Sequence, residues 1–296
     1  MAKKKSQTWS YVGVADDLGV YHVGGRMGAS GGPDRFWSVF QRMTGDLRPL
    51  LRLSHSITLR DWAGSNVEHL HESALSIREA HQKSGTSIIV GGGHDHGAAH
   101  LAGIKDALKP RKGRSIRLGC INIDAHLDLR KPEPEITSGS PFYVAIENKW
   151  IRGEDLVEFG IQSQCNGPAL WDYARKKKIR IIPYSDLRRG RIVEAFKKEL
   201  RKLEKQCDAI VISLDLDALA QAFSPGVSAP QSEGFSSSEV IEMIQVAAES
   251  NKTVSLGIFE LNPIYDLDDR SARLAATVAY RWLEAKLPST PPKSGL

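Results

Sequence analysis

The chain has 296 residues, of which 41% are hydrophobic and 25% are charged, and its formal net charge is +5. This apolar content suffices for one large α/β domain, and no apolar run approaches the roughly 18 residues that a membrane span needs. The three cysteines are widely separated and form no C-x-x-C pair, which argues against a disulfide framework or a zinc ribbon and fits a reducing cytoplasm.

The basic residues do not indicate nucleic-acid binding. Their densest clusters, at 109–114, 175–178 and 197–202, lack interleaved aromatic residues and belong to no recognisable nucleic-acid module. No apolar segment follows the basic N-terminus, so a secretory signal is not expected. We therefore expect a cytoplasmic protein that binds a small molecule and has no membrane or nucleic-acid partner. The sequence leaves open whether it forms a homo-oligomer.

Strand-like apolar segments alternate with helical patterns along the chain. The expected strands lie within residues 9–15, 86–92, 116–124, 156–162, 178–184, 209–217 and 253–261. Patterns with a 3.6-residue period cover residues 66–84, 97–108, 168–177, 190–206, 236–250 and 270–286. This alternation predicts a mostly parallel sheet with both faces covered. No repeat or linker divides residues 1–296, so we expect a single domain with frayed ends at 1–8 and 288–296.

Four carboxylates and two imidazoles follow three of the expected strands: His94, Asp124, His126, Asp128, Asp215 and Asp217. Ligands of an open parallel sheet bind beyond the carboxyl ends of its strands. Alternate residues of a strand share a face, so Asp124, His126 and Asp128 are expected to converge where "CINI" ends. The six side chains should therefore meet at one edge of the sheet.

Such a cluster predicts bound metal ions. Carboxylates crowded near an apolar core resist ionisation unless cations compensate their charge. Two divalent ions would balance four aspartates, and six ligands with shared carboxylates suit a bridged pair. The oxygen-rich donors favour Mn²⁺ and leave Zn²⁺, Co²⁺ and Fe²⁺ open. Taken singly, each residue has a plainer explanation as a turn residue, a helix N-cap or a structural histidine. Three such segments together predict a binuclear site.

Two other segments are not interpreted as separate sites. His96 stands where a dinucleotide-binding loop requires glycine in "GGGHDHG", and the helical pair His96 and His100 lacks the glutamate of H-E-x-x-H. We interpret both histidines as structural or as outer partners of the metal ligands. The segment "GGRMGASGGP" (24–33) lacks the G-K-[ST] of a P-loop and predicts a tight turn before a helix.

The segments "GGGHD", "DAHLD" and "SLDLD" resemble the three metal-binding motifs of the ureohydrolase (arginase/agmatinase) family. The resemblance extends from "GRMGASGGP" to "FELNP" and implies an arginase-like, three-layer α/β/α fold with two Mn²⁺ ions. By this resemblance, one ion would be held by His94, Asp124, Asp128 and Asp215. The other would be held by Asp124, His126, Asp215 and Asp217, so that Asp124 and Asp215 bridge.

Within the family, several details are most similar to the formimidoylglutamases. They are the triple glycine, "DLR" ending in Arg130, "TSGSPF" (137–142), Asn166 after "GIQ", and "SPGVSAP" (224–230). All nine histidines lie at or before His126, so the proton-shuttling histidine that arginases and agmatinases carry after "DAHxD" is missing. Asp95 stands where formimidoylglutamases usually have glutamate, which leaves the exact substrate open.

The resemblance implies hydrolysis of a linear amidine, N-formimidoyl-L-glutamate, to L-glutamate and formamide, a step of histidine degradation. Asp128 would orient the attacking water, and Glu260 would face the cationic amidine. Arg130 would bind a substrate carboxylate, and Ser138 and Asn166 would add hydrogen bonds. The alternatives are another ureohydrolase, acting on agmatine, guanidinobutyrate or arginine, and a non-catalytic metal-binding protein of the same fold.

Overall fold

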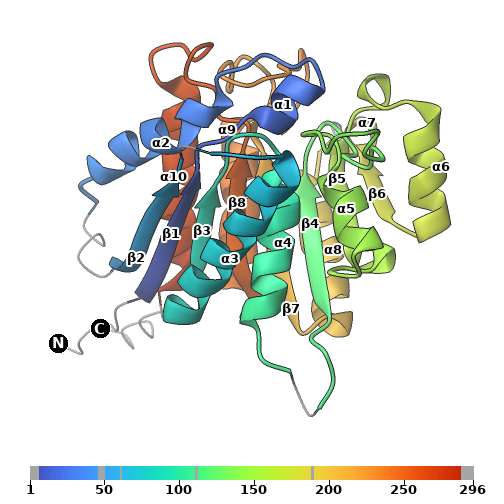
Figure 1. The fold of residues 1–296 in the computed structure, drawn as a ribbon, viewed down its shortest axis with the longest axis horizontal. Helices are drawn as coiled ribbons and strands as arrows, with labels where there is room; N and C mark the ends of the chain where they lie inside the picture. Colours follow the sequence, from blue (N-terminus) through green and yellow to red (C-terminus); the bar gives the residue numbers. More distant parts are fainter. Residues whose placement is uncertain (1–6, 46–50, 61, 111–112, 188–189, 288–296) are drawn as a thin grey trace, which may run out of the picture.

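One parallel sheet organises the molecule (Figure 1). The computed structural model describes residues 7–45, 51–60, 62–110, 113–187 and 190–287. Within them the strands are β1 (Gln7–Val14), β2 (Leu51–Leu59), β3 (Ser87–Val90), β4 (Leu118–Ile123), β5 (Leu156–Ile161), β6 (Arg180–Pro183), β7 (Ala209–Asp215) and β8 (Thr253–Phe259). They pair in the order β2-β1-β3-β8-β7-β4-β5-β6, and every pair is parallel. The predicted parallel sheet is confirmed.

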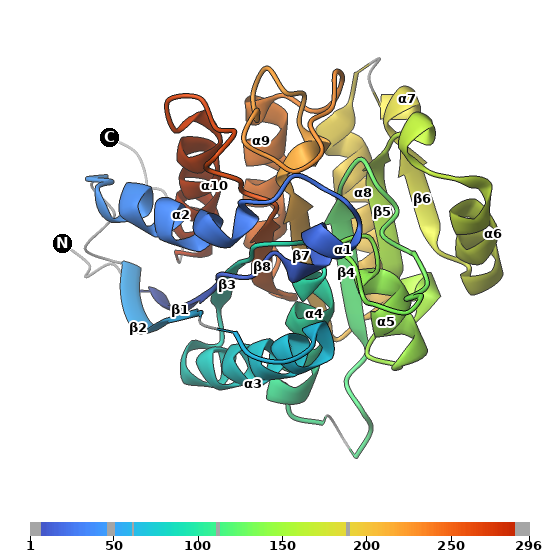
Figure 2. The ribbon, with the colours of Figure 1, turned by 45° about the horizontal axis from the view of Figure 1, so that its top comes forward.

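Helices cover both faces of this sheet, which confirms the three-layer architecture (Figures 1 and 2). The described helices are α1 (Leu18–His22), α2 (Gly32–Gln41), α3 (Asn66–Ser84), α4 (His96–Ala107), α5 (Pro141–Glu147), α6 (Pro168–Lys177), α7 (Tyr184–Leu187), α8 (Ile192–Gln206), α9 (Ser237–Glu249) and α10 (Arg270–Lys286). Helices α2, α8, α9 and α10 pack on one face, and α3, α4 and α5 pack on the other. No helix in the described ranges combines the length and apolarity that crossing a bilayer would require.

The central strands of the sheet are apolar on both sides because each face of the sheet packs against a separate hydrophobic core. In β4, Ile121 and Ile123 belong to the core under α8 and α9, whereas Leu118 and Cys120 face the core under α4 and α5. Cys120 is fully buried, as its place in an apolar run predicts. Buried parallel strands lose the alternation of polar and apolar residues for this reason.

Local signals set the ends of several helices. Helix α3 begins with a capping box in which Ser65 and Glu68 satisfy each other's backbone, and it ends at Gly85, whose φ of 70° suits glycine. The segment 24–33 forms the expected tight turn, with φ of 129° at Gly28, and leads directly into α2. Gln7 and Thr8, expected to fray, lie in β1; residues 1–6 and 288–296 lie outside the described residues.

The strand order determines where a ligand site can form. Strands β3, β8, β7 and β4 are consecutive in the sheet, so the segments that follow them emerge side by side at one edge. His94, the group 124–128, Asp217 and Glu260 lie in these four segments, and Asp215 is the last residue of β7. Residues from four distant parts of the sequence therefore reach one place.

Candidate metal centre

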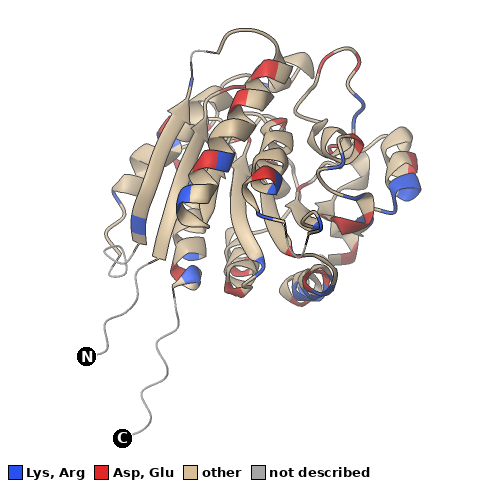
Figure 3. Cartoon of the chain, turned by 60° about the horizontal axis from the view of Figure 1, so that its bottom comes forward, with Lys and Arg blue, Asp and Glu red and all other residues tan. Residues whose placement is uncertain are grey.

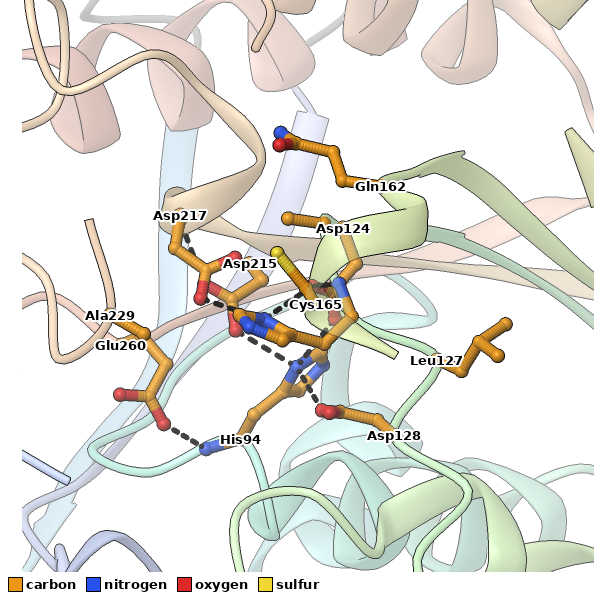
Figure 4. Close-up of polar contacts among 12 residues, drawn as sticks. His94, Asp124, Leu127, Asp128, Gln162, Cys165, Asp215, Asp217, Ala229 and Glu260 are labelled. Carbon is orange, nitrogen blue, oxygen red and sulfur yellow. Dashed lines mark hydrogen bonds and ion pairs between the residues drawn. The ribbon is translucent and has the colours of Figure 1, made fainter. Parts of the chain in front are cut away.

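The six candidate ligands lie together at the strand ends. Figure 4 shows His94, Asp124, Asp128, Asp215 and Asp217 in this cluster. They fall into two groups of ligand atoms, each within 4.8 Å: His94, Asp124, Asp128 and Asp215, and Asp124, His126 and Asp217. Asp124 belongs to both groups, as the resemblance implies for a bridging ligand. Asp215 belongs to the first group, and its Oδ1 accepts a hydrogen bond from the Asp217 N–H at 2.8 Å, so Oδ2 is the atom left for a bridge.

Three carboxylates surround the imidazole of His94. Its Nδ1 lies 3.2 Å from Asp124 Oδ2, 2.9 Å from Asp128 Oδ2 and 3.1 Å from Asp215 Oδ2. None of these contacts in the described structure has hydrogen-bond geometry, so Nδ1 points between the oxygens rather than at one of them. Burial opposes protonation of His94, but the three carboxylates outweigh it and raise its pKa well above the usual value. Burial and neighbouring carboxylates likewise raise the pKa of Asp128 and Asp215.

The second group is built around His126. Its Nδ1 lies 3.1 Å from Asp217 Oδ2 and 3.5 Å from Asp124 Oδ1. Burial raises the pKa of Asp217 to about 7, and Asp217 Oδ1 has no hydrogen-bond partner in the described part of the chain. Burial also disfavours ionised Asp124, but His126 and His94 outweigh it and lower the pKa of Asp124 below its usual range.

These features fit two divalent cations. Each group offers an imidazole nitrogen and carboxylate oxygens aimed at a common centre, which is the donor chemistry of binuclear hydrolase sites. The other nitrogen of His94, Nε2, contacts Ser213 Oγ at 2.8 Å, and the ring stacks on Phe259 with centroids 4.8 Å apart. Such outer contacts are typical of metal-binding histidines, and here they hold the ring with Nδ1 facing the three carboxylates.

The convergence after β4 comes from a turn, not from strand alternation. Strand β4 ends at Ile123, so Asp124, His126 and Asp128 lie beyond it. The His126 N–H donates to Asp124 Oδ1 at 2.7 Å, and Asp128 has a φ of 49° in the left-handed region. A non-glycine residue held in that region is strained, and such strain is common where a fold must aim a functional side chain. The expectation of a shared strand face is therefore wrong, although the side chains do meet.

Asn166, expected to contact substrate, has a different place in the structure. Its Oδ1 accepts from the Leu127 N–H at 2.8 Å, and its Nδ2 donates to the carbonyls of Ala125 and Gln162 at 3.0 and 2.8 Å. The amide is thus committed to the backbone of the 124–128 turn, and Asn166 does not line the cavity above the ligands. We correct its assignment from substrate contact to support of this turn.

A cavity of about 210 Å³ opens above the candidate ligands. Arg130, Ser138 and Glu260 line it, together with every candidate ligand except Asp124. The guanidinium of Arg130 forms no ion pair or hydrogen bond within the described residues, and it lies along Gly139, where an added Cβ would be 2.9 Å from Arg130 Cδ. The cavity therefore presents an uncompensated cation at its rim and acidic groups at its base.

Glu260 is held rigidly beside the metal ligands. Its Oε1 accepts a hydrogen bond from the His94 N–H at 2.8 Å, and its backbone has a φ of 65°. Oε2 has no partner among the described residues, and burial together with the nearby Asp215 raises the pKa of Glu260 to about 8. A buried carboxyl with one free oxygen at a cavity wall is suited to a cationic group of a ligand.

The remaining histidines of the "GGGHDHG" region lie outside the cavity. His96 Nε2 is 2.9 Å from Asp16 Oδ2, and the two residues form a third buried acidic group with Asp95. His100 Nε2 contacts Ser255 Oγ at 2.7 Å, and burial lowers the pKa of His100 to about 3. Both side chains pack inside the fold, in line with their interpretation as structural or outer residues.

A pair of polar residues under the candidate metal centre was not predicted from the sequence. Asn122 Nδ2 donates to Asp124 Oδ2 at 3.1 Å and to Glu158 Oε2 at 2.9 Å, and burial raises the pKa of Glu158 well above its usual value. The signal was present, because both residues interrupt otherwise apolar strands. A polar residue within a buried strand needs a partner, and two such residues on neighbouring strands predict each other.

Similarity to known proteins shows the family of this chain. A model of the Arginase family matches residues 8–284. The chain belongs to the arginase family. It is 32% identical over 275 residues to formimidoylglutamase of Macrococcus caseolyticus, covering 91% of this chain and 82% of that protein, and 31% identical over 291 residues to formimidoylglutamase of Staphylococcus carnosus, covering 95% and 87%. The chain is therefore a formimidoylglutamase-like hydrolase of the arginase family, as its motifs predict.

Solved arginase-family structures share the fold. Trypanosoma cruzi formiminoglutamase, solved with Mn²⁺, superimposes with a TM-score of 0.83 at 26% identity, covering 95% of each chain. Formimidoylglutamase from Bacillus subtilis gives a TM-score of 0.84 over 96% of this chain and 89% of that one, and at 22% identity it supports the fold alone.

Proposed function

We propose that residues 1–296 form a single catalytic domain that hydrolyses N-formimidoyl-L-glutamate to L-glutamate and formamide, a reaction of histidine degradation, with two Mn²⁺ ions. The observation that carries this proposal is the cavity itself. It combines the two groups of metal ligands with a free Arg130 and a buried Glu260. A substrate with a cationic amidine and two carboxylates matches this distribution of charge.

Four aspartates and two histidines would hold the ions. His94 and Asp128 would bind one, His126 and Asp217 the other, and Asp124 and Asp215 would contribute to both. Bound divalent cations supply Lewis acidity here, which makes a water molecule acidic enough to react near neutral pH. The crowded carboxylates would then remain ionised, since the cations replace the protons that burial favours.

The other residues bind and orient the reactants. Asp128, at the cavity wall, would accept a hydrogen bond from the attacking water and direct it at the formimidoyl carbon. Glu260 Oε2 would pair with the amidine, and Arg130 would bind a carboxylate with two parallel hydrogen bonds. Ser138 would add one more. Addition of water and cleavage of the bond to the glutamate nitrogen then release formamide.

The absence of a later histidine favours this substrate over arginine and agmatine. Every histidine lies at or before His126, and the cavity wall beyond it presents Ser138 and Gly139. A site that hydrolyses guanidines with a histidine proton carrier would need another residue there.

The test is to incubate Mn²⁺-loaded protein separately with formimidoylglutamate, arginine, agmatine and guanidinobutyrate and to identify the products. We expect formamide and glutamate from the first and little urea from the others. Urea from a guanidine substrate at a higher kcat/KM would replace the proposal with another ureohydrolase activity. Metal binding without turnover of any substrate would identify a non-catalytic member of the family.

A further inference from the structure

A second large cavity lies at the opposite end of the sheet from the candidate metal centre. It has a volume of about 730 Å³ and is lined by the end of α4, the segment entering β4, the end of α5 with the segment after it, Asp155 just before β5, and Gln206 at the end of α8. Figure 3 turns this end of the molecule toward the viewer. Five basic side chains line it, and we call it the basic cavity: Lys105, Arg114, Arg117, Lys149 and Arg152.

Among the described residues, nearby carboxylates form ion pairs only with the arginines of the basic cavity. Arg117 pairs with Asp155 at 2.8 Å and with Glu154 at 3.0 Å, and Arg152 lies 3.6 Å from the same Glu154. Arg114 pairs with Asp208 at 2.7 Å. Five cations thus share three carboxylates, which leaves an excess of positive charge in the basic cavity.

The two lysines carry this excess. Within the described residues, neither Lys105 nor Lys149 has a carboxylate at ion-pair distance. The Nζ of Lys105 donates to the carbonyl oxygen of Ile116 instead, beside the cavity. Burial lowers the pKa of Lys105, and repulsion from the Arg152 guanidinium lowers it further, whereas Asp155, Asp208 and Asp106 raise it in part. An anion near Lys105 and Arg152 would relieve that repulsion.

We propose that the basic cavity binds a small multivalent anion, with phosphate or carboxylate groups carrying at least two negative charges. Two uncompensated lysines match a dianion, and the arginine N–H groups not used by Asp155 and Asp208 can donate to its oxygens. The volume lies in the range of small-molecule sites, which is about 300–1,000 Å³. Asp155 in the lining, together with Glu154 and Asp208 beside it, favours a compact ligand over a long polyanion such as nucleic acid.

This site is separate from the proposed catalytic cavity. The basic cavity is built at the amino ends of β4 and β5, whereas the metal ligands lie beyond the carboxyl ends of β3, β4 and β7. The two cavities share no lining residue. Variants can therefore distinguish binding in the basic cavity from binding of a dianion at Arg130.

The test is titration calorimetry of the full-length, Mn²⁺-loaded protein with inorganic phosphate and, separately, with succinate, at constant ionic strength. We expect saturable binding of at least one of them at one site per chain. Lys149→Gln should weaken that binding at least about fivefold, since it removes one charge-assisted contact, and Lys149→Glu should weaken it more. The ratio of the two affinities then assigns the phosphate or the carboxylate class.

Two matched controls make the result decisive. Lys198→Gln removes an exposed lysine from α8, and Arg130→Met removes the cation of the catalytic cavity; both should leave the affinity unchanged. Lys105→Met, which also loses the bond to Ile116, is judged only after urea unfolding shows that it folds. The proposal is overturned if neither anion binds saturably, if Lys149→Glu binds as well as the unaltered protein, or if only Arg130→Met abolishes binding.

Discussion

Asn122 connects the candidate metal centre to the core, and replacing it tests how the fold supports the ligands. Its amide is the shared donor to Asp124 and Glu158, at 3.1 and 2.9 Å, and all three side chains are fully buried. Asn122→Leu keeps a similar volume but leaves two buried carboxyl groups without this donor. Each such loss costs roughly 1–3 kcal/mol, so the free energy of unfolding should fall by about 2–6 kcal/mol. Affinity for Mn²⁺ should fall about 10- to 100-fold, because Asp124 loses its outer partner.

Glu158→Gln is the matched control for this change. Burial raises the pKa of Glu158 well above its usual value and so favours its neutral form, and glutamine has the same shape and still accepts from Asn122. We expect stability within about 0.5 kcal/mol of the unaltered protein at pH 7 and nearly unchanged Mn²⁺ affinity. A folded pKa above the unfolded one means that Glu158 stabilises the protein at low pH and loses this contribution as pH rises. Glu158→Gln should therefore become the more stable protein at alkaline pH.

The assay is urea unfolding of both variants, with and without metal, together with equilibrium dialysis against Mn²⁺. The free energy of unfolding and the Mn²⁺ affinity should both fall strongly in Asn122→Leu and little in Glu158→Gln. An equal loss in the free energy of unfolding in the two variants would show that Glu158 acts as a charged group. An unaltered Mn²⁺ affinity in Asn122→Leu would refute the role given to Asn122.

Three further outcomes follow from the cavity and the pKa values. Arg130→Met should raise KM for formimidoylglutamate about 10- to 100-fold while sparing agmatine; equal effects on both would remove Arg130 as the carboxylate ligand. Gly139→Ala should also raise KM for formimidoylglutamate, but by a smaller factor, because its Cβ would lie 2.9 Å from Arg130 Cδ and displace that side chain. An unchanged KM would contradict this packing. The urea midpoint of the metal-free protein should fall as pH rises from about 4 to about 8. The reason is that the folded pKa values of Asp217 and Glu260, about 7 and about 8, exceed the unfolded ones, so their protonation stabilises the folded state. A urea midpoint that increases from pH 5 to about pH 8 would contradict this prediction.

Much of the architecture could be predicted because the central elements follow simple periodicities. The predicted ranges 66–84, 168–177 and 270–286 coincide with α3, α6 and α10. The buried strands were recognisable as apolar runs between these helices, and the rule that ligands gather at carboxyl ends of parallel strands placed the six candidate ligands at one edge. These are consequences of local sequence and of one topological constraint.

Other elements depend on contacts that the local sequence does not show. Strand β2 was missed because it is an edge strand in which most residues are partly or fully exposed, so its apolar pattern is weak. Helix α5 spans only seven residues, too few for a helical period to be evident. The left-handed backbone of Asp128 and the fully bonded amide of Asn166 both arise from the turn after β4. Tertiary contacts decide such turns, and for Asn166 they reversed the prediction.

Bound manganese per chain is the most direct test of the central idea, that His94, His126 and four aspartates hold a pair of divalent cations. Elemental analysis after dialysis against Mn²⁺ should give two ions per chain for the unaltered protein. It should give a marked loss of both for Asp124→Asn, since Asp124 contributes to both groups. One ion or fewer at saturation, or two ions retained by Asp124→Asn with unchanged affinity, would contradict the account.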